Sequence, residues 1–361
     1  MSNLVDAIGD RFDFYIVTSN RDFLKAEPYD CVEAGWHVVG QAKVLYLEQD
    51  RLGFGLVRRL VAEVKPAVIY LNSFFDPRFS LPVLALKTLI GASVPPVICA
   101  PRGELAAGAM EQKGFRKRVY IFAFKFLGLP RKVALHATSR QEAREMRERL
   151  SEKSEVFFAA NLFSRDAGSA RSLPLDPHRK VDVFRIAFLS RIHPKKNLDF
   201  AIECLHGVTE NVEFNIYGPI DDEAYWSYCL RKAERLPSNI KLRFHGPVTH
   251  SEVQITLQKN DLFFFPTKNE NFGHVIIEAL QAGLPVVTSD RTPWNAIASL
   301  KLGACLPLAN TTSFSDRINE ISKWTDEDWY GFQSRLDEFL LLLAQNSNSE
   351  DDHVAMFSAA T

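Results

Sequence analysis

Short apolar runs alternate with segments of helical periodicity along the first half of the chain. Strands are predicted at 12–19, 67–73, 95–103 and 132–139, and helices over 53–66, 81–92 and 140–150. Apolar runs of this length, separated by helical patterns, are typical of βαβ units built on a parallel sheet. The first half therefore predicts a doubly wound α/β domain.

The same alternation returns in the second half. Strands are predicted at 183–191, 212–218, 241–246, 261–267 and 284–290, with helical patterns between them. Residues 164–182 are rich in serine, proline and charge and lack periodicity, which indicates a linker.

The fold class expected is therefore α/β, with two Rossmann-like doubly wound domains that face each other across a cleft. We expect an N-terminal domain at 1–164, a linker at 165–182 and a C-terminal domain at 183–339. The tail at about 340–361 is expected to pack back on the first domain.

Composition narrows the class of protein. The 361 residues are 46% hydrophobic and 24% charged, with a formal net charge of −1, so no bulk field attracts nucleic acid. Five scattered cysteines argue against a disulfide framework and a structural zinc site. The start has no signal-peptide pattern, and no apolar run approaches the ~18 residues that span a bilayer. We expect a cytoplasmic protein, with peripheral contact at the cytoplasmic face of the inner membrane left open.

Two cations follow a strong predicted strand in the second half. Arg191 and Lys196 lie in the loop between that strand and the next helix. Loop cations at the carboxyl end of a parallel strand are suited to clamp an anionic ligand. A solvated loop explains them equally well.

A second loop, in ENFGHVIIEALQAGLPVVTSD (270–290), has more specific features. A helix is predicted to start at Phe272, Gly273 and His274, with Asn271 as N-cap. Gly273 lets backbone N–H groups of the first turn approach a phosphate, while Glu270 would face the same cleft. Glu278 lies among apolar residues, where a carboxylate without a partner is costly; a ribose diol would satisfy it.

At these residues the chain resembles the GT4-type retaining glycosyltransferases of the GT-B fold, in the glycosyl transferases group 1. Glu270 and Glu278 are separated by seven residues and followed by Ala-x-x-x-Gly-x-Pro-Val-Val, as in that family. Arg191 and Lys196 match its upstream pair. Loops similar to family loops occur at 100–104, 136–139, 217–219 and 245–248.

The resemblance implies roles for these residues. Arg191 and Lys196 would hold the donor diphosphate, Glu270 would contact the sugar or its phosphate, and Glu278 would bind the ribose. Further donor contacts are expected from Phe272, Gly273, His274, Val248 and Gly218. The donor would be a UDP-, GDP- or ADP-linked sugar, with no cofactor and no metal. Asp221 and Asp222 read as ordinary acids at a helix start.

Acceptor or sugar contacts are expected in the first domain. Arg102 and Glu104 follow the strand at 95–103, where a surface ion pair is the alternative. His136 ends a strand, and such a histidine is more often a buried structural residue. Asn161 is expected in a turn near the cleft.

The stretch 113–132 carries seven basic residues and no acid, interleaved with aromatic and aliphatic residues. It predicts a basic amphipathic helix that could contact an anionic membrane and meet a lipid-linked acceptor. A core helix with a solvated basic face is the alternative.

One departure from the family pattern concerns the beginning. The chain opens in a predicted helix and reaches a strand at Phe12, so the family's first strand and its Gly-rich loop are missing. A sheet without that strand would leave two neighbours unpaired. We expect either a true start farther upstream or an inactive, truncated form.

The sequence therefore favours a retaining glycosyltransferase that acts in exopolysaccharide, lipopolysaccharide or capsule assembly. A non-catalytic nucleotide-sugar-binding or scaffold protein is the main alternative. A phosphorylase or a nucleotide-sugar epimerase of the same fold fits less well, since neither would use this glutamate pair.

Overall fold

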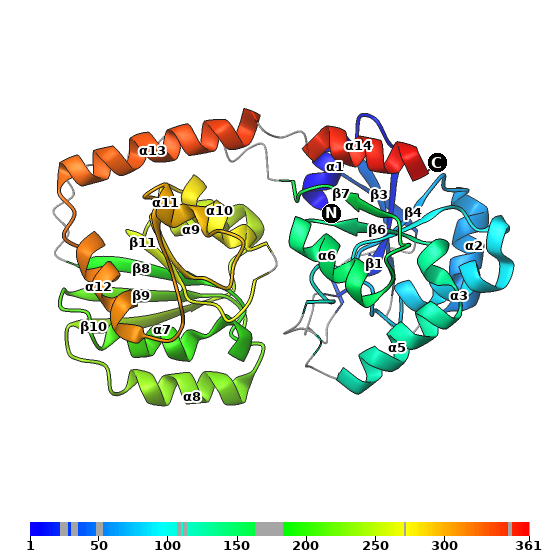
Figure 1. Cartoon of the computed structure of the whole chain (residues 1–361). Coiled ribbons are helices and arrows are strands. Elements are labelled where there is room, and N and C mark those ends of the chain that lie inside the picture. The colour runs from blue at the N-terminus through cyan, green and yellow to red at the C-terminus, as the bar shows by residue number, and fades with distance from the viewer. Residues whose placement is uncertain are drawn as a thin grey trace. The chain divides into compact units, whose positions relative to one another are not determined.

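The computed structural model describes residues 1–21, 28–29, 35–47, 53–106, 110, 114–162, 183–270, 272–345 and 349–360. The predicted linker and the predicted N-cap Asn271 lie outside these ranges. Contacts divide the chain into unit 1, residues 1–164 with 347–361, and unit 2, residues 165–346. Each unit is an α/β fold built on parallel strands (Figure 1).

Unit 1 contains two sheets rather than one. The first has the order β1-β3-β2, from Phe14–Ser19, Ala42–Leu47 and Trp36–Val39, and the second has the order β4-β5-β6-β7. The strands of the second sheet, Ile69–Leu71, Val97–Cys99, Ala134–Ala137 and Val156–Phe158, are all parallel. The β2–β3 pair is antiparallel, and the sequence pattern does not predict it.

The break between the sheets falls between β1 and β4. Within the described part of unit 1, β1 pairs only with β3, and β4 pairs only with β5. Among the described residues, β1 and β4 are therefore both edge strands. The ring of Phe357 contacts Phe14 of β1 and Tyr70 of β4, at centroid distances of 6.4 and 5.6 Å. A shared hydrophobic cluster therefore joins the two sheets.

The helices of unit 1 cover these sheets. They are α1 Ser2–Ile8, α2 Phe54–Val64, α3 Ser80–Ile90, α5 Gly114–Phe126, α6 Arg140–Arg149 and α14 Ser349–Ala360, with short 3-10 turns at Gly91–Ser93 and Leu129–Arg131. Helix α14 packs beside α1 and contributes Met356 and Phe357 to the core of this unit (Figure 1).

Unit 2 is built on one six-stranded parallel sheet of order β10-β9-β8-β11-β12-β13. The strands are β8 Phe184–Leu189, β9 Val212–Tyr217, β10 Ile240–Gly246, β11 Leu262–Phe265, β12 Val286–Ser289 and β13 Gly303–Leu306. All four residues of β11 are buried, because helices cover both faces of a central strand.

The helices of unit 2 lie on both faces of its sheet (Figure 1). Those on one face are α9 Val253–Leu257, α10 His274–Gln281 and α11 Ala296–Ser299; those on the other are α7 Leu198–Leu205 and α8 Glu223–Ala233. Helix α12, Thr311–Ile321, packs against α7, and α13 spans Asp326–Gln345. Short 3-10 turns occupy Pro194–Lys196 and His250–Glu252. This topology brings the loops after β8, β9, β10 and β11 to one edge of the sheet.

Candidate active site

The loops after β8 and β11 are tied together by hydrogen bonds. The backbone N–H of Lys268 donates to the carbonyl of Lys195 at 3.0 Å. Asn197, in the left-handed region at φ +63°, donates from its side chain to the carbonyl of Pro266 at 2.9 Å. Two segments about 70 residues apart in sequence are thereby held at a fixed spacing.

This arrangement places Lys196 against Glu270. The ammonium of Lys196 lies 2.5 Å from Oε2 of Glu270, and the two side chains are 19% and 18% exposed. The same ammonium lies 5.5 Å from the ring centroid of Phe265. The pair is therefore largely shielded from water but remains open on one side, where it can exchange partners.

Arg191 forms a second ion pair, with Asp221. Its Nη1 lies 2.7 Å from Oδ2 of Asp221; the arginine side chain is 50% exposed and the aspartate 9%. The interpretation of Asp221 as an ordinary helix-start acid is therefore wrong, because its carboxylate turns to Arg191. Asp222 does cap α8, accepting from the N–H of Tyr225 at 2.9 Å.

Gly218 joins the ends of three strands. A Cβ at this position would lie 2.0 Å from the carbonyl oxygen of Ser190, and φ is +131°. Its N–H donates to the carbonyl of Gly246 at 2.7 Å. Only glycine allows the loops of β8 and β9 to approach this closely. Val248 follows in the loop after β10 and is half-buried.

Helix α10 begins at His274 with Gly273, at φ +77°, as its N-cap, two residues after the position that a cap at Asn271 would give. The rings of Phe272 and His274 lie 4.7 Å apart on either side of this glycine. The indole N–H of Trp294 donates to the carbonyl of Phe272 and fixes the approach to the helix.

Glu278 lies one turn into α10 and is half-buried. Within the described ranges, its carboxylate has no hydrogen bond or ion pair. Burial raises the pKa of Glu278 above its ordinary value, and the nearby His250 lowers it by a smaller amount. A desolvated carboxylate without a partner is costly, so Glu278 is a candidate for contact with a ligand.

The residues of unit 1 that were predicted to contact the acceptor or the sugar form hydrogen bonds within unit 1. The side chain of Glu104 accepts hydrogen bonds from Ser73 and from the N–H groups of Phe74 and Phe75, at 2.8, 2.6 and 3.1 Å. It does not pair with Arg102, so the surface ion pair is wrong. His136 is fully buried and hydrogen-bonded at both ring nitrogens, which is a structural role.

Sequence reasoning missed Glu142. It is 2% exposed and accepts from the N–H of Gly103 at 2.6 Å and from the N–H and hydroxyl of Thr138 at 2.8 and 2.6 Å. The spacing Ser139-x-x-Glu142, typical of a capped helix start, was the available signal. Ser139 does cap α6, but the glutamate side chain turns to the neighbouring loop instead.

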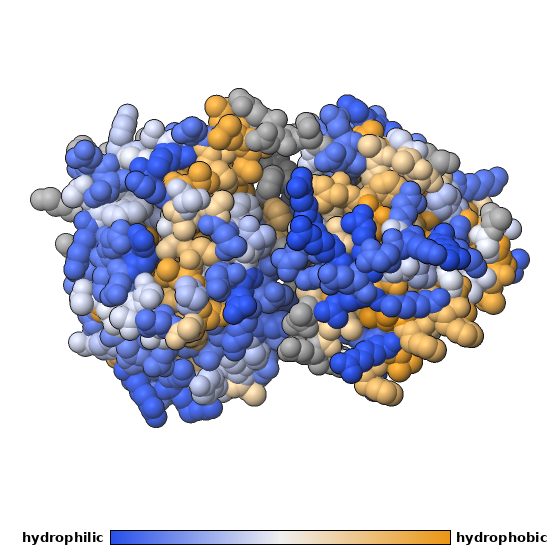
Figure 2. Space-filling view, in the orientation of Figure 1, coloured by the Kyte–Doolittle hydropathy of each residue, from blue (hydrophilic) through white to orange (hydrophobic). Residues whose placement is uncertain are grey.

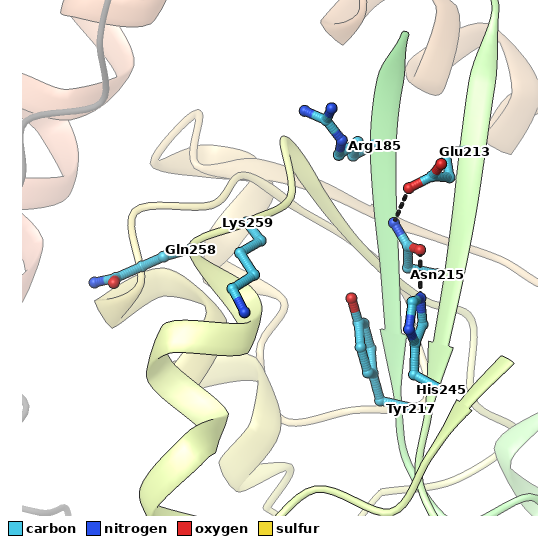
Figure 3. Close-up of a pocket in the computed structure, with 7 residues that line it drawn as sticks. All are labelled: Arg185, Glu213, Asn215, Tyr217, His245, Gln258 and Lys259. Carbon is cyan, nitrogen blue, oxygen red and sulfur yellow. Dashed lines mark hydrogen bonds between the residues drawn. The ribbon is translucent and has the colours of Figure 1, made fainter. Parts of the chain in front are cut away.

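A pocket of about 540 Å³ lies on the β8–β9 face of unit 2 (Figure 3). Figure 3 shows Gln258 and Lys259 on one side and the strand residues on the other, with the side chain of Gln258 extending away from the strands. Asn215 donates to Glu213 at 3.3 Å and accepts from His245 at 2.7 Å. None of the predicted donor residues lines this pocket, so the proposed donor site is separate from it.

The described ranges contain no group of three His, Cys, Asp or Glu side chains that could hold a metal ion. None of their helices is long and apolar enough to cross a membrane.

Most of unit 2 resembles a known family of proteins. Residues 176–328 match the family model described as glycosyl transferases group 1. A phosphatidyl-myo-inositol mannosyltransferase from Mycobacterium leprae (strain TN) is 27% identical over 139 residues. That match covers 37% of this chain and spans 36% of the length of the mannosyltransferase.

Solved structures resemble nearly the whole chain. WaaG, a glycosyltransferase involved in lipopolysaccharide biosynthesis, has a TM-score of 0.68 at 12% identity, covering 99% of this chain and 94% of WaaG. HepE from Anabaena, solved with UDP and glucose, has a TM-score of 0.63 at 16% identity, covering 88% and 86%. Identities this low establish the shared fold alone, which is GT-B, as the sequence predicts.

Proposed function

We propose that the protein is a retaining glycosyltransferase of the GT4 type, because residues 176–328 match the family model of the glycosyl transferases group 1. It moves a sugar from a nucleotide-sugar donor to a saccharide or a lipid-linked saccharide. Residues 183–339 hold the donor, and residues 1–164 with about 340–361 hold the acceptor. The assembly of exopolysaccharide, lipopolysaccharide or capsule is the proposed setting, at the cytoplasmic face of the inner membrane.

The observation that carries this proposal is the unpaired Glu278 at the carboxyl edge of the sheet. Its carboxylate accepts hydrogen bonds from the two ribose hydroxyls and thereby gains the partners that the protein does not supply. The first-turn N–H groups of α10, beyond Gly273, meet the diphosphate. The backbone near Val248 and Gly218 borders the base, and Phe272 and His274 border the diphosphate.

Arg191 and Lys196 carry the electrostatic part of catalysis. As the bond between the sugar C1 and the phosphate oxygen breaks, negative charge grows on the nucleoside diphosphate. The ion pairs of these two cations with Asp221 and Glu270 are partly replaced by contacts with the diphosphate, whose charge the cations stabilise. No metal or cofactor takes part. Glu270, released from Lys196, accepts hydrogen bonds from the donor sugar.

With retention of configuration, the acceptor oxygen bonds to C1 on the face that the diphosphate leaves. The acceptor hydroxyl proton goes to an oxygen of the departing phosphate, so no protein base is required. The HepE structure with UDP supports UDP as the nucleotide of the donor. GDP- and ADP-linked sugars are the other candidate donors.

Helix α5 provides the proposed membrane contact. Phe115, Phe122 and Phe126 are 81%, 70% and 81% exposed and share one face of the helix, while Phe124 is buried. Hydrophobic residues gather over α5 at the lower edge of unit 1 (Figure 2). The exposed Arg116, Arg118 and Lys125 would meet anionic headgroups.

The break between β1 and β4 favours a second candidate, a catalytically inactive nucleotide-sugar-binding or scaffold protein. Incubation with UDP-, GDP- and ADP-hexoses, with and without a lipid extract that contains lipid-linked saccharides, separates the two. Acceptor-dependent release of one nucleoside diphosphate supports the enzyme. Binding of a donor without release supports the inactive protein, and no binding of any donor contradicts both.

A further inference from the structure

Arg102 is held in a fixed orientation at the carboxyl edge of the β4–β7 sheet. It lies three residues after Cys99, the last residue of β5, and has φ +52°, an uncommon value for a residue with a side chain. Its Nε donates to the side-chain oxygen of Asn72 at 2.8 Å, Nη1 to that of Asn161 at 2.6 Å, and Nη2 to the hydroxyl of Tyr70 at 2.9 Å. Three of the five N–H groups are thereby used, and two remain.

The partners of Arg102 are all neutral. Asn72 and Asn161 carry amides, and burial raises the pKa of Tyr70 to about 12, so its phenol stays protonated. His136, hydrogen-bonded to Tyr70 at 2.7 Å, has its pKa lowered to about 3 by burial and is also neutral. None of the carboxylates in the described ranges lies within ion-pair distance of Arg102. The half-buried guanidinium therefore carries a positive charge that its surroundings do not balance.

Two carboxylates near Arg102 form their hydrogen bonds with other groups. Glu104 accepts from the loop after β4, and Glu142 accepts from Gly103 and Thr138. Each binds backbone N–H groups of the loops that flank the arginine. A carboxylate two positions from Arg102 thus turns away from it, which leaves the guanidinium available to an external anion.

From this geometry we propose that Arg102 binds an anionic group of the acceptor, a phosphate or a carboxylate on its saccharide part. That the anion belongs to an acceptor rests on the proposed function. The anion site itself depends only on residues of unit 1. A planar guanidinium, fixed by three hydrogen bonds and with two free N–H groups, is suited to a phosphate or carboxylate. Asn72 is exposed, so the site is open to solvent on that side.

The test is a binding titration of the full chain with three probes: a hexose 6-phosphate, a hexuronate and the neutral hexose. The variants are Arg102→Gln, Arg102→Lys and, as a matched loss of charge, Arg78→Gln, an exposed arginine of the same unit. We expect one or both anions to bind at least about tenfold more tightly than the neutral hexose. Arg102→Gln should remove that difference, Arg102→Lys should keep part of it, and Arg78→Gln should leave it unchanged.

Phosphate binding alone assigns a phosphorylated acceptor, and uronate binding alone assigns an acidic sugar. Equal affinity for all three probes, no binding of any, or anion affinity that survives Arg102→Gln overturns the inference. A melting temperature for Arg102→Gln within a few degrees of wild type shows that the loss is local. Donor nucleotide affinity, measured on the same samples, tests the proposed function separately, so the two claims can fail independently.

Discussion

The ammonium of Lys196 and the carboxylate of Glu270 lie 2.5 Å apart although the residues are 74 positions apart in the chain. The loops after β8 and β11 create this contact through their shared backbone hydrogen bonds. Each charge thereby stabilises the other while no donor is bound. In the proposed mechanism, a diphosphate that binds at this edge offers Lys196 a stronger anion, and Glu270 becomes available to the sugar.

Lys196→Ala should lower kcat for glycosyl transfer by about 10²–10³-fold, because it removes one cation that stabilises the leaving diphosphate. Steady-state kinetics with a saturating donor checks this. Lys195→Ala is the matched control, since it removes the same charge one residue earlier while its backbone carbonyl still binds Lys268. An equal loss of kcat in the two variants would show that only the total positive charge of the loop matters, and not the position of Lys196.

Three glycines with positive φ should differ in their cost of substitution by alanine. We expect a loss in the free energy of unfolding of about 1 kcal/mol for Gly246→Ala, about 2 for Gly273→Ala and about 4 for Gly218→Ala. A Cβ at Gly246 meets open space, at Gly273 it meets Glu270 and Ile276 atoms at 3.0 Å, and at Gly218 it meets a backbone oxygen at 2.0 Å. Denaturant unfolding measures the series, and any other order contradicts the packing described.

Glu278→Gln should change how stability depends on pH. The folded pKa of Glu278 lies above its ordinary value of 4.5, so the folded protein binds this proton more tightly than the unfolded chain. Wild-type stability therefore falls, relative to the variant, as the pH rises from about 4.5 through the folded pKa. Melting temperatures at pH 4 and pH 7 check the sign: the advantage of the variant should be larger at pH 7. An advantage that is equal or smaller there would mean that the carboxylate is not desolvated.

Replacing Phe122 and Phe126 with serine should weaken binding to anionic vesicles about tenfold or more, since both exposed rings would lose their burial in the interface. Co-sedimentation with phosphatidylglycerol vesicles measures this, and added salt should weaken wild-type binding further. Tyr330→Ser, at an exposed aromatic residue of α13, is the control. If the double variant binds vesicles as tightly as wild type, the membrane contact lies elsewhere.

Much of unit 2 could be predicted from the sequence. The strands and helices alternate with clear periods, and the residues after β8 and β11 meet because parallel strands end at one edge. The ion pair of Arg191 with Asp221 could not be predicted, since its partners are 30 positions apart and nothing in either loop specifies the pairing. The orientation of Glu104 and Glu142 has a similar cause, since Glu104 accepts from residues about 30 positions away and Glu142 accepts from Gly103, 39 positions away, as well as from the nearby Thr138.

The sequence was least informative about the first sheet of unit 1. The strand β2 is short and exposes Val38 and Val39, so it lacks the alternation that marks a half-buried strand. The position of Phe357 between β1 and β4 depends on a helix more than 300 residues away from β1 in the chain. Local periodicity carries no information about such contacts.

The measurement that tests the central claim most directly is a calorimetric titration of wild type and Glu278→Ala with UDP-, GDP- and ADP-sugars. Gln281→Ala, at the C-terminal end of the same helix, serves as the matched control. The account predicts that one nucleotide sugar binds wild type and the control alike, and binds Glu278→Ala about 10–100-fold more weakly because the charge-assisted hydrogen bonds to the ribose are lost. Equal affinity of Glu278→Ala and wild type, or no binding of any nucleotide sugar to wild type, would contradict it.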